Sequence, residues 1–345
     1  MNYYFPSFIQ NPNIKQEILP QLEVTVNSGT NALRLLLRSF NLTANDKVAV
    51  PSFVCNSVKQ AVEQEKLAPA LFDLKPDNSF WTSYNFDRIK TENIKVIILV
   101  HLYGFIHPDT NEIINYCETN KIKLIHDAAQ SYGIDEQFIL RGDGIVYSFG
   151  PGKSTTAAGG AWIKNFGGNK SFFTFNKPTL LSFQNTKGRL FLKSRIFGYQ
   201  FNQYEKLLNV IVNKIHSTSI FRMSDFQLKM ASYSISNLKE VIPFRKKRYN
   251  ILKTATVKNS LLKIAYEDNN GLYFKIIFFV ENEVDKFKAF LNQNDVPFFT
   301  LFNETEKIGL ENFDKNATKF IEISCETSIP ENEIERIVGL LNSYK

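Results

Sequence analysis

The sequence is poor in residues that build cross-linked or metal-held folds. Only three of its 345 residues are cysteine (Cys55, Cys117 and Cys325), and no Cys-x-x-Cys or Cys/His spacing joins them. This excludes a disulfide scaffold and a zinc finger, and we expect no metal. No run of about 18 apolar residues occurs, so no membrane-spanning helix is expected. The opening MNYYFPSFIQNPN lacks a basic segment followed by an apolar run, so we expect no secretory signal and a cytoplasmic location.

What the chain does contain is an ordinary globular composition, with 43% hydrophobic and 22% charged residues. Its length predicts two lobes, or one large α/β domain with an appendage. The net charge of +7 is concentrated in residues 170–214, which hold eight basic residues and one acid, Glu205. The rest of the chain therefore has no net charge. A nucleic-acid-binding protein more often spreads its charge over a recognisable fold, so we expect no nucleic-acid partner.

Short apolar segments alternate with amphipathic ones over residues 22–163. The predicted strands are 47–51, 69–73, 96–100, 123–126, 144–148 and 160–163, and the predicted helices are 31–40, 56–65 and 110–120. This alternation predicts an α/β fold, with a mostly parallel sheet sandwiched by helices. Ligands of such sheets bind beyond the carboxyl ends of the strands.

From Asp225 onward the pattern predicts a smaller α+β lobe. Its predicted helices are 225–238, 283–294 and 331–341, and its predicted strands are 273–280, 296–302 and 320–323. We therefore assign residues 1–219 to a large α/β domain that includes a basic, aromatic insertion at about 168–219. Residues 220–345 are assigned to a small C-terminal α+β domain.

Two motifs stand where the predicted sheet would bind a ligand. Ser28, Gly29, Thr30 and Asn31 precede a helix, where free amides and the helix dipole favour an anion. The alternative is an ordinary helix cap. Asp127 follows an apolar strand and precedes two alanines, which leaves room for a flat group nearby. Its alternative role is to cap the next helix.

A third motif combines a hydroxyl with an amine. Ser148 ends a strand, and Lys153 follows five residues later in a Gly/Pro turn, before the small-residue loop 155–160. A lysine forms a Schiff base when its surroundings depress its pKa. Alone, such a lysine could equally be a solvated surface charge.

In order and spacing, these motifs resemble the DegT–DnrJ–StrS family of sugar aminotransferases, which are pyridoxal phosphate (PLP) enzymes of fold type I. The matching segments are 28–33, 50–53, 100–104, 127–130 with Gly133, Ser148-Phe149 with Lys153, and Gly159-Gly160. The resemblance covers residues 22–165 well. In the small lobe it is limited to Arg222-Met-Ser and the closing helix.

The resemblance implies a role for each matching residue. Lys153 would bind PLP through a Schiff base and later move a proton between substrate and cofactor. Asp127 would face the pyridine nitrogen, and Gln130 would lie near the ring hydroxyl. The phosphate would be held by Gly29, Thr30, the amide of Asn31 and Ser148. Lys153 also argues against the dehydratase branch, where histidine replaces the lysine, and the fold type implies a homodimer.

The chain departs from the family pattern at four places. Only 27 residues precede Ser28, where the family usually has a longer arm. The ring-stacking aromatic of the family falls on Cys55, so Phe53 becomes a second candidate to cover the ring face. Residues 220–222, Ile-Phe-Arg, replace Asn-Tyr-Arg, which removes an Asn that reaches the partner subunit's phosphate. The segment 167–219 is longer than the family norm.

Residues 170–214 interleave their basic residues with nine aromatic ones and leave three interpretations open. The segment could be an insertion whose aromatics pack on the body and whose lysines are solvated. It could contact a membrane surface, an interpretation we favour less. It could also bind the diphosphate of a nucleotide sugar. The candidate residues for that contact are Lys187, Arg189, Lys193 and Arg195.

Together these observations predict a PLP-dependent aminotransferase. It would convert a nucleotide-linked keto sugar to an amino sugar, with glutamate or glutamine as amino donor. One alternative is another fold-type I enzyme that acts on a cyclitol or a free amino acid. The other is a non-catalytic binding or regulatory protein that retains the cofactor pocket.

Overall fold

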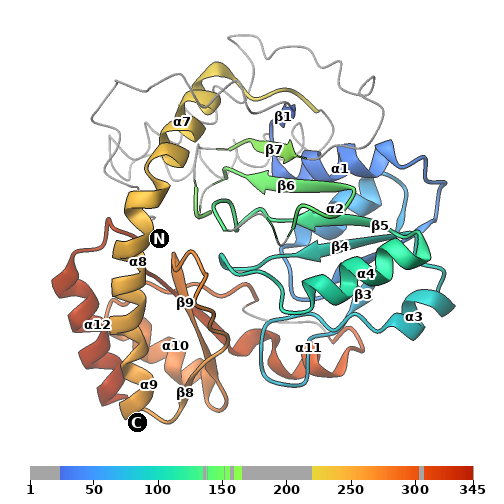
Figure 1. Cartoon of the computed structure of the whole chain (residues 1–345). Coiled ribbons are helices and arrows are strands. Elements are labelled where there is room, and N and C mark those ends of the chain that lie inside the picture. Colours follow the sequence, from blue (N-terminus) through green and yellow to red (C-terminus); the bar gives the residue numbers. More distant parts are fainter. Residues whose placement is uncertain are drawn as a thin grey trace, which may run out of the picture.

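The main element of the fold is a seven-stranded sheet (Figure 1). The computed structural model describes residues 24–134, 137, 139–150, 152–155, 159–164, 220–302 and 307–344. The strand order is β1-β7-β6-β5-β4-β2-β3. The strands are β1 Val24–Val26, β2 Lys47–Pro51, β3 Ala68–Phe72, β4 Val96–Val100, β5 Lys123–Asp127, β6 Gly144–Ser148 and β7 Ala161–Lys164.

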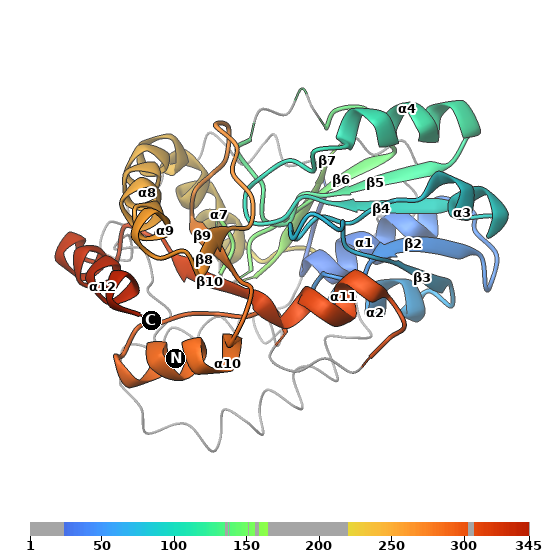
Figure 2. The same ribbon diagram turned by 90° about the horizontal axis from the view of Figure 1, so that it is seen from below.

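Strands β2 to β6 pair in parallel, whereas β7 pairs antiparallel with both β6 and β1. Helices α1 (Gly29–Ser39) and α2 (Asn56–Gln64) cover one face of the sheet, and α3 (Phe86–Thr91) and α4 (Thr110–Asn120) cover the other (Figure 2). Every residue of β4, VIILV, is buried because both faces are covered. The predicted α/β fold is therefore confirmed.

The C-terminal lobe contains a three-stranded antiparallel sheet of order β10-β9-β8. Its strands are β8 Leu262–Ile264, β9 Lys275–Val280 and β10 Phe320–Ser324. Its helices are α7 Asp225–Ser236, α8 Leu238–Lys253, α9 Ala255–Lys258, α10 Val284–Gln293, α11 Glu311–Asn316 and α12 Glu331–Ser343, with a short 3-10 turn at Ala317–Lys319. Helices α8 and α12 lie side by side (Figure 1).

One expectation for this lobe needs correction, and one helix was not predicted. The predicted strand 296–302 is wrong, because only Phe299 forms an isolated bridge there, with Glu322. The long helix α8 was missed, since Pro243 and a run of basic residues interrupt its apolar pattern. No helix in the described part of the chain is long and apolar enough to cross a membrane.

The two lobes share one hydrophobic core. The ring of Phe53 packs edge-on against Phe320 of β10, with ring centroids 4.9 Å apart. Nearby, the carboxylate of Asp73 accepts hydrogen bonds from the amides of Asn312 and Phe313 at the start of α11, at 2.9 and 2.8 Å. These contacts hold the small lobe against the edge of the large sheet where the predicted site residues lie.

Candidate active site

The predicted site residues gather at the carboxyl edge of the large sheet. Asp127 is the last residue of β5, and Ser148 is the last residue of β6, the neighbouring parallel strand. Both are buried, with 4% and 7% of their surface exposed. Lys153 lies in the loop that follows β6, and the helix α1 begins at Gly29 beside Ser148.

The start of α1 offers unpaired amide groups. Ser28 caps the helix, because its Oγ accepts the amide of Asn31 at 3.2 Å, so the capping interpretation is confirmed. In the described part of the chain, the amides of Gly29 and Thr30 donate to no acceptor. A β-carbon added at Gly29 would lie only 3.4 Å from the Oγ of Ser148. Two free amides and a hydroxyl therefore share a small space that suits an anion.

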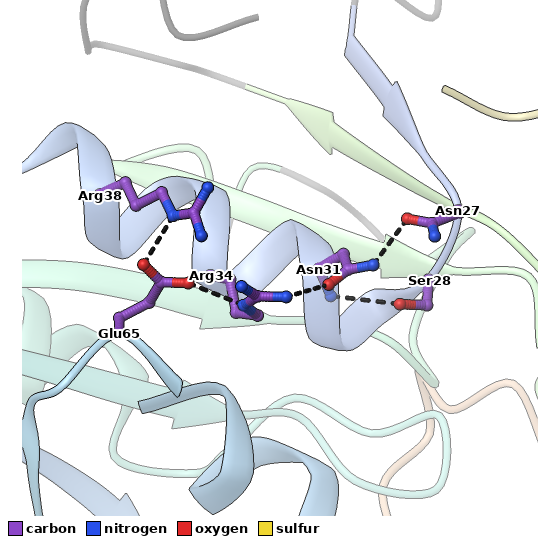
Figure 3. Close-up of polar contacts among 6 residues, drawn as sticks. All are labelled: Asn27, Ser28, Asn31, Arg34, Arg38 and Glu65. Carbon is purple, nitrogen blue, oxygen red and sulfur yellow. Dashed lines mark hydrogen bonds and ion pairs between the residues drawn. The ribbon is translucent and has the colours of Figure 1, made fainter. Parts of the chain in front are cut away.

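The side chain of Asn31 forms hydrogen bonds that stabilise the start of α1 (Figure 3). Its Nδ2 donates to Asn27 Oδ1 at 2.7 Å, and its Oδ1 accepts from Arg34 Nη1 at 2.9 Å. Arg34 is buried and its Nε also pairs with Glu65 at 2.7 Å. Because its amide and its side chain are both engaged, Asn31 fixes the helix start, and Gly29 and Thr30 retain the free amides.

Asp127 does not cap a helix, since a turn follows it. Its Oδ1 accepts the amide of Ala129 at 3.0 Å, and its second oxygen accepts no hydrogen bond from the described residues. Burial raises the pKa of Asp127, while the nearby charge of Lys153 lowers it. A buried carboxylate with a spare oxygen is suited to face a cationic N–H group.

Lys153 is half-buried, which does not fit a solvated surface charge. Burial lowers its pKa, and the nearby ammonium group of Lys275 lowers it further. The charges of Asp127, Cys55 and Glu322 act in the opposite direction. A depressed pKa favours the uncharged amine, which is the nucleophilic form of lysine.

Gln130 lies at the edge of the same site. Its Oε1 accepts the amide of Tyr103 at 2.9 Å. Tyr103 has a left-handed backbone, with φ of 56°, and Gly104 follows with φ of 80°. The backbone conformation after β4 directs the Tyr103 amide toward Gln130. The resulting hydrogen bond fixes the orientation of the glutamine side chain.

One of the two ring-face candidates is wrong. Phe53 is fully buried and packs against Phe302 and Phe320, so it is not exposed to a ligand. Cys55 is exposed at the start of α2, and its sulfur is near enough to Lys153 to affect the pKa of that lysine. Cys55 therefore remains at the position where the family has an aromatic ring.

Four further residues reach this region and were missed by the sequence analysis. Tyr103 Oη donates to Glu322 Oε1 at 2.8 Å, and Lys275 pairs with the other oxygen of Glu322. Arg245 of α8 donates to the carbonyl of Ser154, next to Lys153, at 3.0 Å. For Lys275 and Glu322, the sequence offered one signal, a charged residue in a mostly apolar strand. Lys275 opens the strand KIIFFV (β9), and Glu322 is the central residue of FIEIS (β10).

Other predicted positions are not part of this cluster. Lys187, Arg189, Lys193 and Arg195 lie outside the described residues. Ile220 is half-buried against the core, and the carbonyl of Phe221 accepts the amide of Asn27 at 2.9 Å. The segment that replaces Asn-Tyr-Arg therefore pairs with the residue before the helix cap.

Known proteins resemble this chain in sequence. The sequence model of the DegT/DnrJ/EryC1/StrS aminotransferase family matches residues 20–339. UDP-N-acetyl-3-dehydro-alpha-D-glucosamine 3-aminotransferase of Acidithiobacillus ferrooxidans is 32% identical over 141 residues, which is 38% of this chain and 36% of the relative. GDP-perosamine synthase of Escherichia coli O157:H7 is 30% identical over 152 residues, 42% of this chain and 41% of the relative. The matches thus span less than half the length of these relatives.

Solved structures share the fold. DesV of S. venezuelae superposes with a TM-score of 0.69 at 16% identity, covering 92% of this chain and 83% of that chain. NtdA of Bacillus subtilis, with bound cofactor PMP, superposes with a TM-score of 0.67 at 17% identity, covering 92% and 72%. The likeness therefore extends over both lobes.

Proposed function

The chain belongs to the DegT/DnrJ/EryC1/StrS aminotransferase family, and from this membership we propose that it is a PLP-dependent aminotransferase. Its substrate is a nucleotide-linked keto sugar, which it converts to an amino sugar. The observation that carries the proposal is the convergence of Lys153, Asp127 and the free amides of α1 at one sheet edge. Relatives named for UDP-, GDP- and dTDP-linked sugars support the substrate class.

The residues at this edge fit PLP in three separate respects. The amides of Gly29 and Thr30, with the hydroxyl of Ser148, suit the phosphate. The spare oxygen of Asp127 suits the protonated ring nitrogen, and the amine of Lys153 suits the aldehyde carbon. When bound, PLP supplies an electron sink for the substrate carbon. The PMP named for NtdA is the amino form of this cofactor and supports the assignment.

Each residue then has a defined task. Lys153 would hold the cofactor through Nζ and, once released, would move a proton from the substrate carbon to the cofactor. Asp127 keeps a proton on the ring nitrogen by its charge. Gln130, oriented by the Tyr103 amide, would lie beside the ring hydroxyl. The Ser28 cap and the Asn31 bridge keep the phosphate amides in place.

The proposal extends to the properties that follow from the family. The amino donor is glutamate or glutamine, the protein is a cytoplasmic homodimer, and the lobes divide near residue 220. Basic residues of the segment 170–214 contact the diphosphate of the substrate. This contact places the excess positive charge of the chain beside the most negative group of the substrate.

The test uses the purified full chain after incubation with PLP. Glutamate or glutamine should bleach the visible absorbance of the bound cofactor, and a keto nucleotide sugar should restore it. A Lys153→Ala variant is the control and should show neither change. A cofactor that stays bound while no amino donor converts it would contradict the proposal and favour a binding protein.

A further inference from the structure

The main chain beside Lys153 is anchored by an arginine of the small lobe. In residues 152–155 of the loop after β6, the carbonyl of Ser154 accepts a hydrogen bond from Arg245 Nη2 at 3.0 Å. Between described residues, this is the one hydrogen bond that the main chain of 152–155 makes. The hydroxyl groups of Ser154 and Thr155 are buried and have no partner in the same part of the chain. The contact with Arg245 is therefore the polar anchor of this loop.

Arg245 is itself held in place by a carboxylate. It lies in α8, and its Nη2 is 2.8 Å from Glu326 Oε1 and 2.9 Å from Glu326 Oε2. Its Nε also donates to Oε2, at 3.3 Å. The two side chains are 5% and 17% exposed. Contacts from two nitrogens fix the plane of the guanidinium group, so Nη2 is directed at the Ser154 carbonyl.

A second arginine of α8 makes comparable bonds within the small lobe alone. Arg248 Nη2 donates to the carbonyls of Ile329 and Thr327, at 3.0 and 3.4 Å. Arg245 instead reaches a residue of the large lobe, directly after Lys153. Because the chain bends only at two dihedral angles per residue, fixing the Ser154 carbonyl restricts the direction in which the Lys153 side chain leaves the main chain.

We propose that the Arg245–Glu326 pair is a positioning element that holds the Lys153 loop in its reactive place. The functional value of this position rests on the proposed function, in which Nζ of Lys153 must reach the aldehyde carbon of PLP. In that step the amine and the aldehyde form a C=N bond and release one water. A small displacement of a reacting group lowers the rate of such a step strongly.

The pair should act on bond formation and not on phosphate binding. No hydrogen bond between described residues joins Arg245 or Glu326 to the amides of Gly29 and Thr30. Loss of the anchor should therefore slow the bond at Lys153 while the phosphate is bound as before. A general loss of structure would affect both.

The experiment compares PLP with PMP on the purified, cofactor-free full chain. PMP has an amine in place of the aldehyde, so it binds without forming a bond to Lys153. The rate of bond formation with PLP follows from the visible absorbance, and mass spectrometry after borohydride reduction identifies the lysine. Calorimetry gives the affinity for PMP. The variants are Arg245→Met and Glu326→Gln, and Arg248→Met is the matched control from the same helix.

Arg245→Met should slow bond formation by on the order of 10- to 100-fold and leave the PMP affinity unchanged. Glu326→Gln should slow it less, because Arg245 remains but loses its charged partner. Arg248→Met should leave both quantities unchanged. Without cofactor, trypsin should cut the Lys153–Ser154 bond faster in Arg245→Met than in the wild type or in Arg248→Met, because the loop has lost its anchor.

Thermal unfolding establishes which variants fold. If Arg245→Met does not, Arg245→Met/Glu326→Leu replaces it, since this variant leaves no unpaired carboxylate and should slow the bond in the same way. If neither folds, Glu326→Gln decides. A wild-type rate in the deciding variant would overturn the proposal. So would an equal loss of PMP affinity, or the same slowing in Arg248→Met.

The wild type separates this proposal from the proposed function. If it forms no covalent bond at Lys153 while trypsin cleavage still depends on Arg245, the aminotransferase is refuted and the anchor stands. If the bond forms at Lys153, and forms as fast in folded Arg245→Met, the positioning role alone is refuted.

Discussion

Mild acid should destabilise this fold through the histidines beneath the site. His101 and His126 are fully buried, and His107 is nearly so. Burial lowers the pKa of His126 to about 4 and that of His107 to about 4, and it places the pKa of His101 well below the usual range. The main-chain amide of His101 donates to the carbonyl of Asp127 at 2.9 Å, so the backbone of His101 lies beside that of the predicted cofactor residue.

The hydrogen bonds of His101 and His126 show which ring nitrogen carries the proton in the neutral form. The amide of His107 donates to His101 Nδ1 at 3.1 Å, so the proton of His101 is on Nε2. That Nε2 donates to His126 Nδ1 at 3.0 Å, and His126 Nε2 donates to the carbonyl of Arg141 at 2.8 Å. A second proton on either Nδ1 would break the bond that this nitrogen accepts.

The sign and size of the acid effect follow from the pKa values. Since the folded pKa lies below the unfolded value of 6.5, the unfolded chain binds more protons, and the free energy of unfolding falls as the pH drops from about 6.5 to about 4. Between about pH 7 and pH 5, each of His126 and His107 should cost about 2 kcal/mol. Their sum, about 4 kcal/mol, is a large part of the usual stability of a domain.

Urea unfolding at about pH 7, 6 and 5 measures this loss. Carboxylates whose pKa is lowered, such as Asp46 and Glu92, act mainly below their ordinary values of 3.8 and 4.5, outside this window. His126→Gln should reduce the loss by about 2 kcal/mol, because one titrating ring is removed. A wild type with equal stability at both ends of the window would refute this reasoning, as would a variant with an unchanged loss.

Three further predictions concern the site itself. Asp127→Asn should lower the rate of transamination about 10²-fold or more, because the neutral amide cannot hold a proton on the ring nitrogen by charge. The melting temperature should be unchanged. Near-normal turnover in the cofactor-loaded variant would contradict this role. Bound PLP should slow alkylation of Cys55 by iodoacetamide, and Cys55→Tyr should slow cofactor loss on dialysis; unchanged rates would remove Cys55 from the ring face. Arg245→Met should cost about 3 kcal/mol in urea unfolding, because it leaves the carboxylate of Glu326, which is 17% exposed, without its partner at 2.8 Å; a loss below about 1 kcal/mol would contradict this.

The sequence predicted best what a local pattern determines. Apolar strands and amphipathic helices can be predicted from the spacing of hydrophobic residues. Because β5 and β6 were predicted in this way, Asp127 and Ser148 at their ends could be placed at one edge of the sheet. The helix cap at Ser28 could also be predicted from its local sequence. The strand at 296–302 failed because an apolar run does not specify its partner: β9 already pairs with β10, and Phe299 makes only a single bridge.

Contacts between segments that are far apart in the sequence could not be predicted from local patterns. Counting along the chain placed Phe53 and Cys55 near the ring face, but only the contact of Phe53 with Phe320 shows that it belongs to the core. Lys275 and Glu322 are 47 residues apart, and Tyr103 and Glu322 are 219 apart. Each of these residues alone resembles an ordinary polar residue of a strand or loop, and only the fold brings them together.

The large lobe and the small lobe contribute different things to the candidate site. The large lobe supplies groups that would touch the cofactor, and these lie in the segments where the sequence motifs are clear. The small lobe supplies Lys275 and Glu322, which pair with each other and bind Tyr103, and Arg245, which holds the carbonyl next to Lys153. Motifs in the first lobe can locate such a site, but only the folded chain shows which residues of the small lobe pack against it.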